Sequence, residues 1–171
     1  MHELTIEQRT AFRAAVERAA VIPAVRTAVE NVYIALQDAI DLRRPVCVTS
    51  GRCCRFDEFG HRLFVTTMEL AAFVRGLRQA APFAVGSPQA GGCPFQADKL
   101  CSVHSIRPFG CRVFFCDATA SEWQQVQYAR FHAELKRLHD ELEVPYFYME
   151  WRAALKALEL PYPRVSSEDS L

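Results

Sequence analysis

The cysteines of this chain are the residues whose number and spacing most directly predict chemistry. Residues 1–46 and 117–171 contain none, and all seven cysteines fall between these flanks. They form two groups, which are Cys47, Cys53 and Cys54, then Cys93, Cys101, Cys111 and Cys116. Burial penalises a thiolate charge, and a bound metal ion offsets that penalty. We therefore predict that all seven are candidate ligands of zinc or iron, with an iron–sulfur cluster as one form of the iron site.

The spacing leaves the partition of these ligands open. The groups lack the paired CxxC knuckles of zinc ribbons, so folding must bring the two groups together. Our first choice of four ligands is Cys47, either Cys53 or Cys54, Cys93, and one of Cys101, Cys111 and Cys116. Zinc–sulfur bonds of about 2.3 Å would place four such sulfurs roughly 3.5–4 Å apart.

Four other side chains are candidates for supporting such a site. His104 follows Cys101 closely enough to be a further ligand, although a polar turn residue is the plainer interpretation. Arg107 and Arg112 have N–H groups that can donate to thiolate sulfur, with surface ion pairs as the alternative. The fourth, Glu69, fits a helix-capping position, which is the plainer interpretation of this residue. We expect His61, His132 and His139 to be solvated.

The elements that must position these residues are mostly helical. Apolar residues recur at helical spacing on both sides of the cysteine groups, so we predict a mainly α, single helical domain with a short β-hairpin, built around irregular cysteine-rich segments. Its parts are a helical hairpin over 1–45, a metal-binding segment over 46–117, helices over 118–165 and a disordered tail over 166–171.

Capping signals place the beginnings of these helices. Capping boxes begin at Thr5, Thr66 and Thr119, each followed three residues later by Glu or Gln. Pro145 is typical of the first turn of a helix, so we expect the last helix to begin there. Turn signals at Gly60 predict that residues 55–60 pair with residues 61–65 in the β-hairpin.

Composition restricts the compartment and the partners. Lys plus Arg and Asp plus Glu number 20 each, which disfavours nucleic acid as a general partner. We expect no membrane-spanning segment and no signal peptide, and therefore a cytoplasmic protein whose thiols stay reduced. The expected partner is a metal ion, and the sequence does not point to a protein partner.

Residues 46–117 resemble the zinc- or iron-chelating family named for its CxxCxxCC motif, the YkgJ-like cysteine cluster proteins. The resemblance follows the order of short motifs along the chain, which are Cys47 to Cys54, Thr66-Thr67-Met68-Glu69, Cys93-Pro94-Phe95, Cys101, Arg107-Pro108, Cys111-Arg112 and Cys116. It implies metal chelation by these cysteines, with Glu69 as a candidate for contact with the ligands. The flanking helices lie outside it.

One position departs from the family pattern, because Ser50 stands where the motif has its second cysteine. Either one centre has lost a ligand to water, histidine or carboxylate, or Ser50 lies outside the site. Three functions stay open: a metal-binding protein, an iron–sulfur enzyme or electron carrier, and a metal-free thiol redox protein. Whether the chain is an enzyme is left open, since the sequence has no fingerprint for a second substrate.

Overall fold

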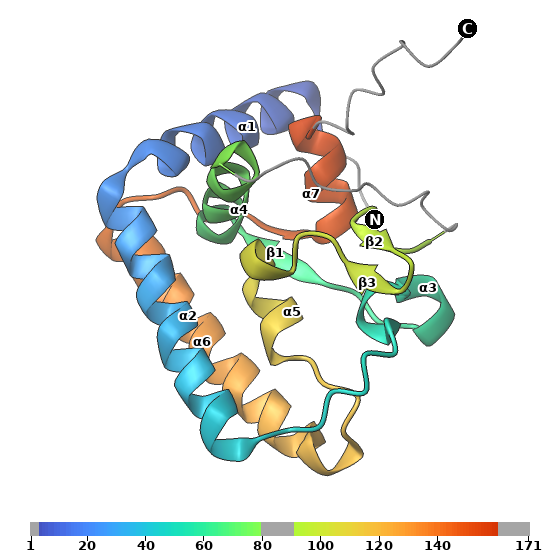
Figure 1. Ribbon diagram of the computed structural model, residues 1–171. Coiled ribbons are helices and arrows are strands. Elements are labelled where there is room, and N and C mark those ends of the chain that lie inside the picture. The colour runs from blue at the N-terminus through green and yellow to red at the C-terminus, as the bar shows by residue number, and fades with distance from the viewer. Residues whose placement is uncertain (1–3, 80–90, 161–171) are drawn as a thin grey trace, which may run out of the picture.

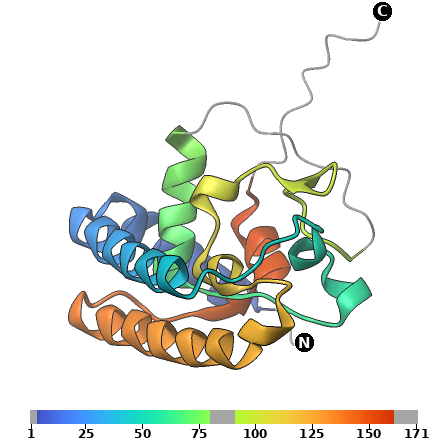
Figure 2. The same cartoon turned by 60° about the horizontal axis from the view of Figure 1, so that its bottom comes forward.

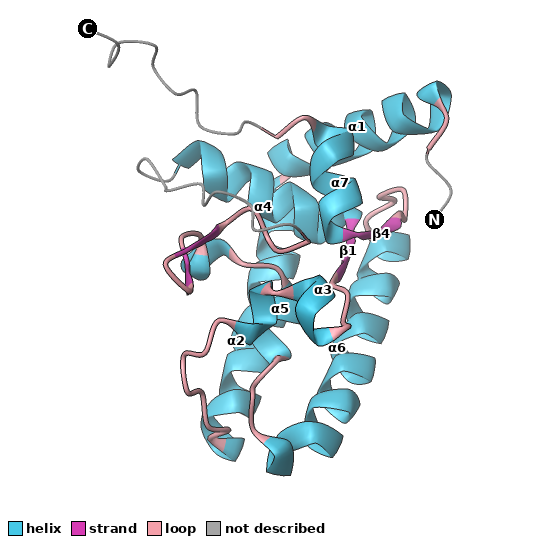
Figure 3. Ribbon diagram, turned by 90° about the vertical axis from the view of Figure 1, so that its right-hand side faces the viewer, coloured by secondary structure: helices cyan, strands magenta, loops and turns pink. Residues whose placement is uncertain are grey.

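A computed structural model describes residues 4–79 and 91–160, and it is mainly helical with short strands (Figures 1 and 3), which confirms the predicted fold class. The longer helices are α1 (Ile6–Val21), α2 (Pro23–Arg43), α4 (Thr67–Gln79), α6 (Ser121–Glu141) and α7 (Trp151–Leu158). The short ones are η1 (Arg52–Cys54), α3 (Phe56–Phe59), η2 (His104–Ile106), α5 (Phe109–Val113) and η3 (Ala118–Ala120). The predicted tail over 166–171 lies outside the described residues.

The first two helices do not form the predicted helical hairpin. Thr5 and Gln8 make the expected capping box at the start of α1, and Pro23 begins α2 after a break at Ile22. The two helices meet there at 84°. Instead of pairing with each other, α1 packs on α4 while α2 runs beside α6 (Figures 1 and 2). Their apolar faces are therefore buried by elements far away in the sequence.

The predicted β-hairpin over 55–65 is also wrong. Residues 56–59 form α3, and β1 (Phe64–Thr66) pairs antiparallel with β4 (Tyr148–Glu150) from the far end of the chain. The N–H of Trp151 extends this pairing by donating to the carbonyl oxygen of Leu63 over 2.8 Å. A hairpin does occur between β2 (Gln96–Ala97) and β3 (Leu100–Cys101), inside the second cysteine segment.

Of three further helix starts that we predicted, the one at Thr66 is confirmed, and the starts of α6 and α7 lie at other residues. The Thr66–Glu69 capping box forms, with the N–H of Thr66 donating to Glu69 Oε2 over 2.8 Å. At the start of α6, however, Asp117 accepts from the N–H of Thr119, and η3 makes a separate turn before Ser121. The last helix begins at Trp151 with Glu150 as its cap, because residues 148–150 are taken up by β4.

The largest buried cluster lies where α1, α4 and α7 meet the cysteine segments. It contains Phe12, Phe73, Trp151 and two of the cysteines, Cys54 and Cys93. The irregular segments therefore share the core that the helices form. Among the described residues, no single helix combines the length and apolar character of a membrane span, although α1 and α2 meet that test together as a bent pair.

Candidate metal centre

The first cysteine segment turns sharply at Gly51, whose φ of 69° lies in the left-handed region. A Cβ added there would lie 2.8 Å from the carbonyl oxygen of Lys99, so glycine permits close contact with the second segment. Two hydrogen bonds hold the segments together. Gln96 Nε2 donates to the carbonyl oxygen of Gly51 over 2.9 Å. The N–H of Cys93 donates to the carbonyl oxygen of Cys54 over 2.7 Å.

The β2–β3 hairpin places Cys101 against this turn. Asp98 and Lys99 both have positive φ, as the two-residue turn of a tight hairpin requires. The pairing sets Cys101 opposite Gln96, the residue that bonds to Gly51. Local turns in both segments therefore bring thiols together that lie up to 48 residues apart, from Cys53 to Cys101.

Four of these thiols interact through Cys54, and we name Cys53, Cys54, Cys93 and Cys101 the four-thiol group. The sulfurs of Cys53 and Cys54 lie 4.0 Å apart. Hydrogen bonding to Cys101, Cys53 and Cys93 raises the pKa of Cys54. The same bonding lowers the pKa of Cys53 to about 6, that of Cys101 to about 7, and that of Cys93. The Cys54 thiol therefore keeps its proton while the thiols around it ionise more readily than an isolated cysteine.

The described residues do not contain a complete metal site. Within residues 4–79 and 91–160, no group of three or more His, Cys, Asp or Glu side chains is arranged to hold a metal ion. A full tetrahedral set of sulfurs at the expected spacing is therefore not preformed in that part of the chain. The two segments nevertheless meet, and the soft sulfur donors of the four-thiol group are of the kind that zinc and iron select.

Aromatic rings enclose one side of the four-thiol group. Phe73 lies edge-on to both Phe95 and Trp151, with ring centroids 5.3 and 4.9 Å apart. The indole N–H of Trp151 donates to the sulfur of Cys93 over 3.4 Å. We predicted that Trp151 faces inward, but the sequence carries no signal for this sulfur contact. A buried donor of this kind stabilises a thiolate.

The remaining cysteines lie outside this group. Cys111 is partly buried, and burial raises its pKa, with the charges of Cys93, Cys101 and Cys53 adding to the effect. Cys47 is exposed, and Cys116 lies beside Ser50, with 3.2 Å between the serine oxygen and the sulfur. Our first choice of four ligands included Cys47, which is exposed and is not among the thiols that act on Cys54.

The supporting residues have distinct positions. Glu69 is buried, and its two oxygens accept from Thr66 and from the N–H of Phe109 at the start of α5. Arg112 donates to the carbonyl oxygens of Arg107 and Ser105, so it holds the backbone of the second segment.

Arg107 and His104 lie on the outer side of the group. The guanidinium of Arg107 contacts the imidazole of His104, and it donates to the backbone carbonyl oxygen of His104 over 2.9 Å. The charge of Arg107 also lowers the pKa of Cys53 and Cys101, after the larger effect of Cys54. Of the two predicted arginines, Arg107 therefore has an electrostatic effect on the four-thiol group.

Two histidines differ from their expected solvated positions. His139 is 1% exposed, and Nε2 accepts from the N–H of Met68 at the start of α4, 3.2 Å away. His61 is partly buried, stacks on Phe114 at 5.4 Å between ring centroids, and has Nε2 3.3 Å from the carbonyl oxygen of Cys53. Both positions depend on tertiary packing, which a lone histidine in a sequence does not reveal.

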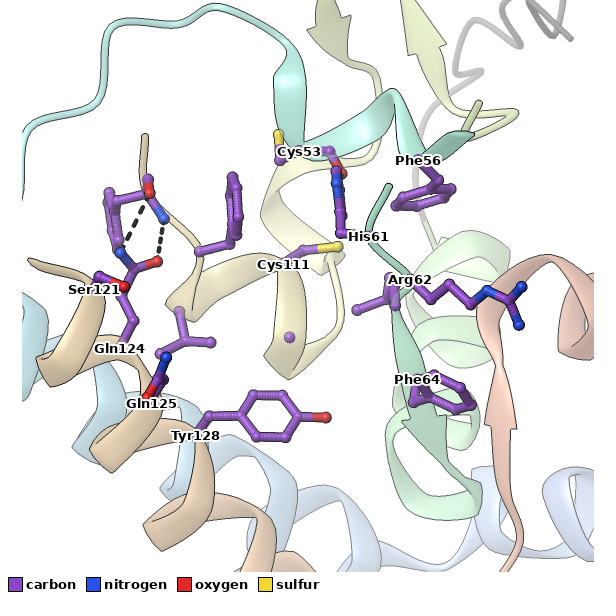
Figure 4. Close-up of a pocket in the computed structure, with 15 residues that line it drawn as sticks. Cys53, Phe56, His61, Arg62, Phe64, Cys111, Ser121, Gln124, Gln125 and Tyr128 are labelled. Atoms are coloured by element: carbon purple, nitrogen blue, oxygen red, sulfur yellow. Dashed lines mark hydrogen bonds between the residues drawn. The ribbon is translucent and has the colours of Figure 1, made fainter. Parts of the chain in front are cut away.

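A pocket of about 410 Å³ adjoins the four-thiol group (Figure 4). Cys53 and Cys111 line it together with His61 and aromatic side chains. No pattern in the sequence predicts this pocket, because its walls come from three separate stretches of the chain.

Comparisons with protein-family models, with curated proteins and with solved structures find no match. The resemblance to the cysteine cluster family therefore stays a prediction.

Proposed function

We propose that this chain binds zinc or iron through cysteine thiolates, with the four-thiol group as its ligands. The observation that carries the proposal is that both cysteine segments meet beside Cys54. Its sulfur lies 4.0 Å from the sulfur of Cys53, and its carbonyl oxygen accepts from the N–H of Cys93 over 2.7 Å. Three of these thiols have lowered pKa values, which favours their ionised forms. The pKa of Cys54 is raised, so the bound metal ion must offset the free energy needed to remove its proton.

The surroundings support the same proposal. Trp151 and Arg107 supply a buried N–H donor and a positive charge beside the sulfurs, and Phe95 keeps that side apolar. Because the thiols are not arranged as a complete ligand set in the described residues, binding requires their side chains to turn towards a common centre. We also propose a cytoplasmic location, since all seven cysteines are free thiols.

Elemental analysis of anaerobically purified protein, combined with an optical spectrum, tests the proposal. We expect close to one equivalent of zinc or iron, and less than about 0.5 equivalents of any transition metal would contradict it. Broad absorbance at about 400 nm that bleaches on reduction would identify an iron–sulfur cluster. A colourless, zinc-loaded protein would exclude one.

Matched cysteine variants test the choice of ligands. Cys54→Ser and Cys101→Ser each remove a member of the four-thiol group and should lower the metal content at least about fivefold. Cys47→Ser removes an exposed thiol outside the group and should leave the metal content unchanged. Equal loss in all three variants, or full retention in Cys54→Ser, would contradict the assignment.

A metal-free thiol redox function is the second candidate. It is favoured by the short distance between two thiols, because the sulfurs of Cys53 and Cys54 lie 4.0 Å apart and hydrogen bonding between them lowers the pKa of Cys53 to about 6. This function predicts metal-free protein in which Cys53 reacts with iodoacetamide much faster than Cys47 at neutral pH.

A further inference from the structure

The pocket beside the four-thiol group lies between three parts of the chain (Figure 4). One wall is formed by residues from Cys53 to Phe64, another by α5 and the residues that follow it, and the third by the first two turns of α6. Its volume of about 410 Å³ is within the range of small-molecule sites. This volume suits a molecule of one or two rings.

Aromatic side chains dominate the lining. Phe56, Phe64, Phe114, Phe115 and Tyr128 all contribute to it. Rings of this kind pack best against another ring, in stacked or edge-to-face geometry. His61 is already held in such a pair with Phe114, and its position is further set by the contact of Nε2 with the carbonyl oxygen of Cys53.

Polar groups line the side that α6 contributes. Gln124 is engaged with the backbone of Phe115, accepting from its N–H over 2.8 Å and donating to its carbonyl oxygen over 3.3 Å. Ser121 and Gln125 add a hydroxyl and an amide to the same side of the pocket (Figure 4). A ligand with one hydrogen-bonding substituent fits this combination better than a pure hydrocarbon.

Full charges are directed away from the pocket. Among the described residues that line it, Arg62 is the one with a permanently charged side chain, and its guanidinium points outward (Figure 4). A charged ligand would lose hydration there without gaining an ionic partner. The lining therefore favours an uncharged ligand.

We propose that this pocket binds a small uncharged aromatic molecule of one or two rings with one hydrogen-bonding substituent, one end of which lies beside Cys53 and Cys111. Cys53 also belongs to the four-thiol group, so a ligand here lies beside the proposed metal centre. The statement that the ligand lies beside a metal ion rests on the proposed function, whereas binding of the ligand in the pocket does not.

The test is titration of the purified protein with 2-naphthol, followed by amide chemical shifts in nuclear magnetic resonance spectra. We expect saturable binding with a Kd of about 1 mM or tighter, the affinity reasonable for a ligand of this size. The largest shifts should occur at Gly110 and at the side-chain amide of Gln125, which line the pocket. 2-Naphthalenesulfonate, which has the same rings and a negative charge, should bind at least about tenfold more weakly.

Two tryptophan variants on one helix provide a matched comparison. Gln125→Trp places a bulky ring at the pocket, and we expect affinity for 2-naphthol to fall at least about tenfold. Val126→Trp changes the next residue, which is 57% exposed and does not line the pocket, and affinity should stay within about twofold. Phe114→Ala, which removes the ring stacked on His61, should weaken binding by about threefold or more.

Binding that fails to saturate, shifts that lie elsewhere, or equal affinity in Gln125→Trp and the unchanged protein would overturn the proposal. Metal content measured on the same samples separates it from the proposed function. Metal-free protein that binds 2-naphthol supports the pocket and contradicts the metal centre. Metal-loaded protein that shows no binding contradicts the pocket alone.

Discussion

The hydroxyl oxygen of Ser50 lies 3.2 Å from the sulfur of Cys116, although 66 residues separate them. A second contact holds the same two stretches together, because the N–H of Val46 donates to Asp117 Oδ2 over 3.1 Å. The position where the cysteine cluster motif has its second cysteine therefore lies beside Cys116, which is not one of the thiols that act on Cys54.

This contact predicts the behaviour of Ser50→Cys. Mild oxidation should form a disulfide with Cys116, which we expect to stabilise the protein by about 2–4 kcal/mol because it closes a long loop. Peptide mapping by mass spectrometry and the denaturant midpoint before and after reduction provide the measurement. Val48→Cys, an exposed position in the same stretch, serves as the control. If Cys116 stays free in Ser50→Cys, the two side chains do not meet.

The buried carboxyl of Glu69 predicts a dependence of stability on pH. Burial raises its pKa to about 7, against the opposing effect of its hydrogen bonds with Thr66 and Phe109. The folded state therefore holds a proton that the unfolded state releases, and the free energy of unfolding should fall by about 3 kcal/mol as pH rises from about 4.5 to 7.

Glu69→Gln should remove this part of the pH dependence. In the variant, the side-chain NH2 group faces a backbone N–H of Thr66 or Phe109 that donated to Glu69. We therefore expect the free energy of unfolding to fall by about 1–3 kcal/mol at low pH, where Glu69 is protonated. Urea unfolding at several pH values measures both effects. A variant with the same pH profile as the unchanged protein would show that Glu69 does not titrate in this range.

His139 predicts the opposite trend. Burial lowers its pKa, since the charged imidazolium would lose hydration. The hydrogen bond that Nε2 accepts from the N–H of Met68 also requires an unprotonated Nε2. The unfolded state then binds a proton that the folded state excludes, so stability is lost as pH falls below about 6.5. His139→Gln should cost about 1–3 kcal/mol at pH 7, and the difference from the unchanged protein should shrink at lower pH.

His132→Gln is the matched control for this prediction. His132 lies on the same helix but is only partly buried, with Nε2 3.0 Å from the hydroxyl oxygen of Tyr146. We expect a change of less than about 1 kcal/mol in the free energy of unfolding. An effect as large as that of His139→Gln would mean that the two histidines are equivalent in the fold.

Arg107 should control the reactivity of two thiols. Its charge lowers the pKa of Cys53 and Cys101, so Arg107→Gln should raise both values and slow alkylation by iodoacetamide at pH 7 by about two- to fivefold in metal-free protein. Lys99→Gln removes a positive charge from the exposed β2–β3 turn and should leave the rates unchanged. Equal rates in Arg107→Gln and the unchanged protein would contradict this role.

Local signals in the sequence predicted the fold class and several helix starts correctly. The capping boxes at Thr5 and Thr66 form because each depends on residues three positions apart. The box predicted at Thr119 does not form, because the N–H of Thr119 donates to the carboxylate of Asp117 instead of to Glu122. The hairpin over 55–65 fails because β1 pairs with β4, and no local pattern identifies so distant a partner.

The sequence alone determined that the thiols of this chain are concentrated between two helical regions, and that their order resembles a cysteine cluster motif. Only the tertiary structure decided which of them meet. The turn at Gly51 and the β2–β3 hairpin bring Cys54 to Cys93 and Cys101, while Ser50 and Cys116 meet elsewhere. The physical reason is that helix and capping preferences act over a few residues, whereas these contacts are set by packing between distant segments.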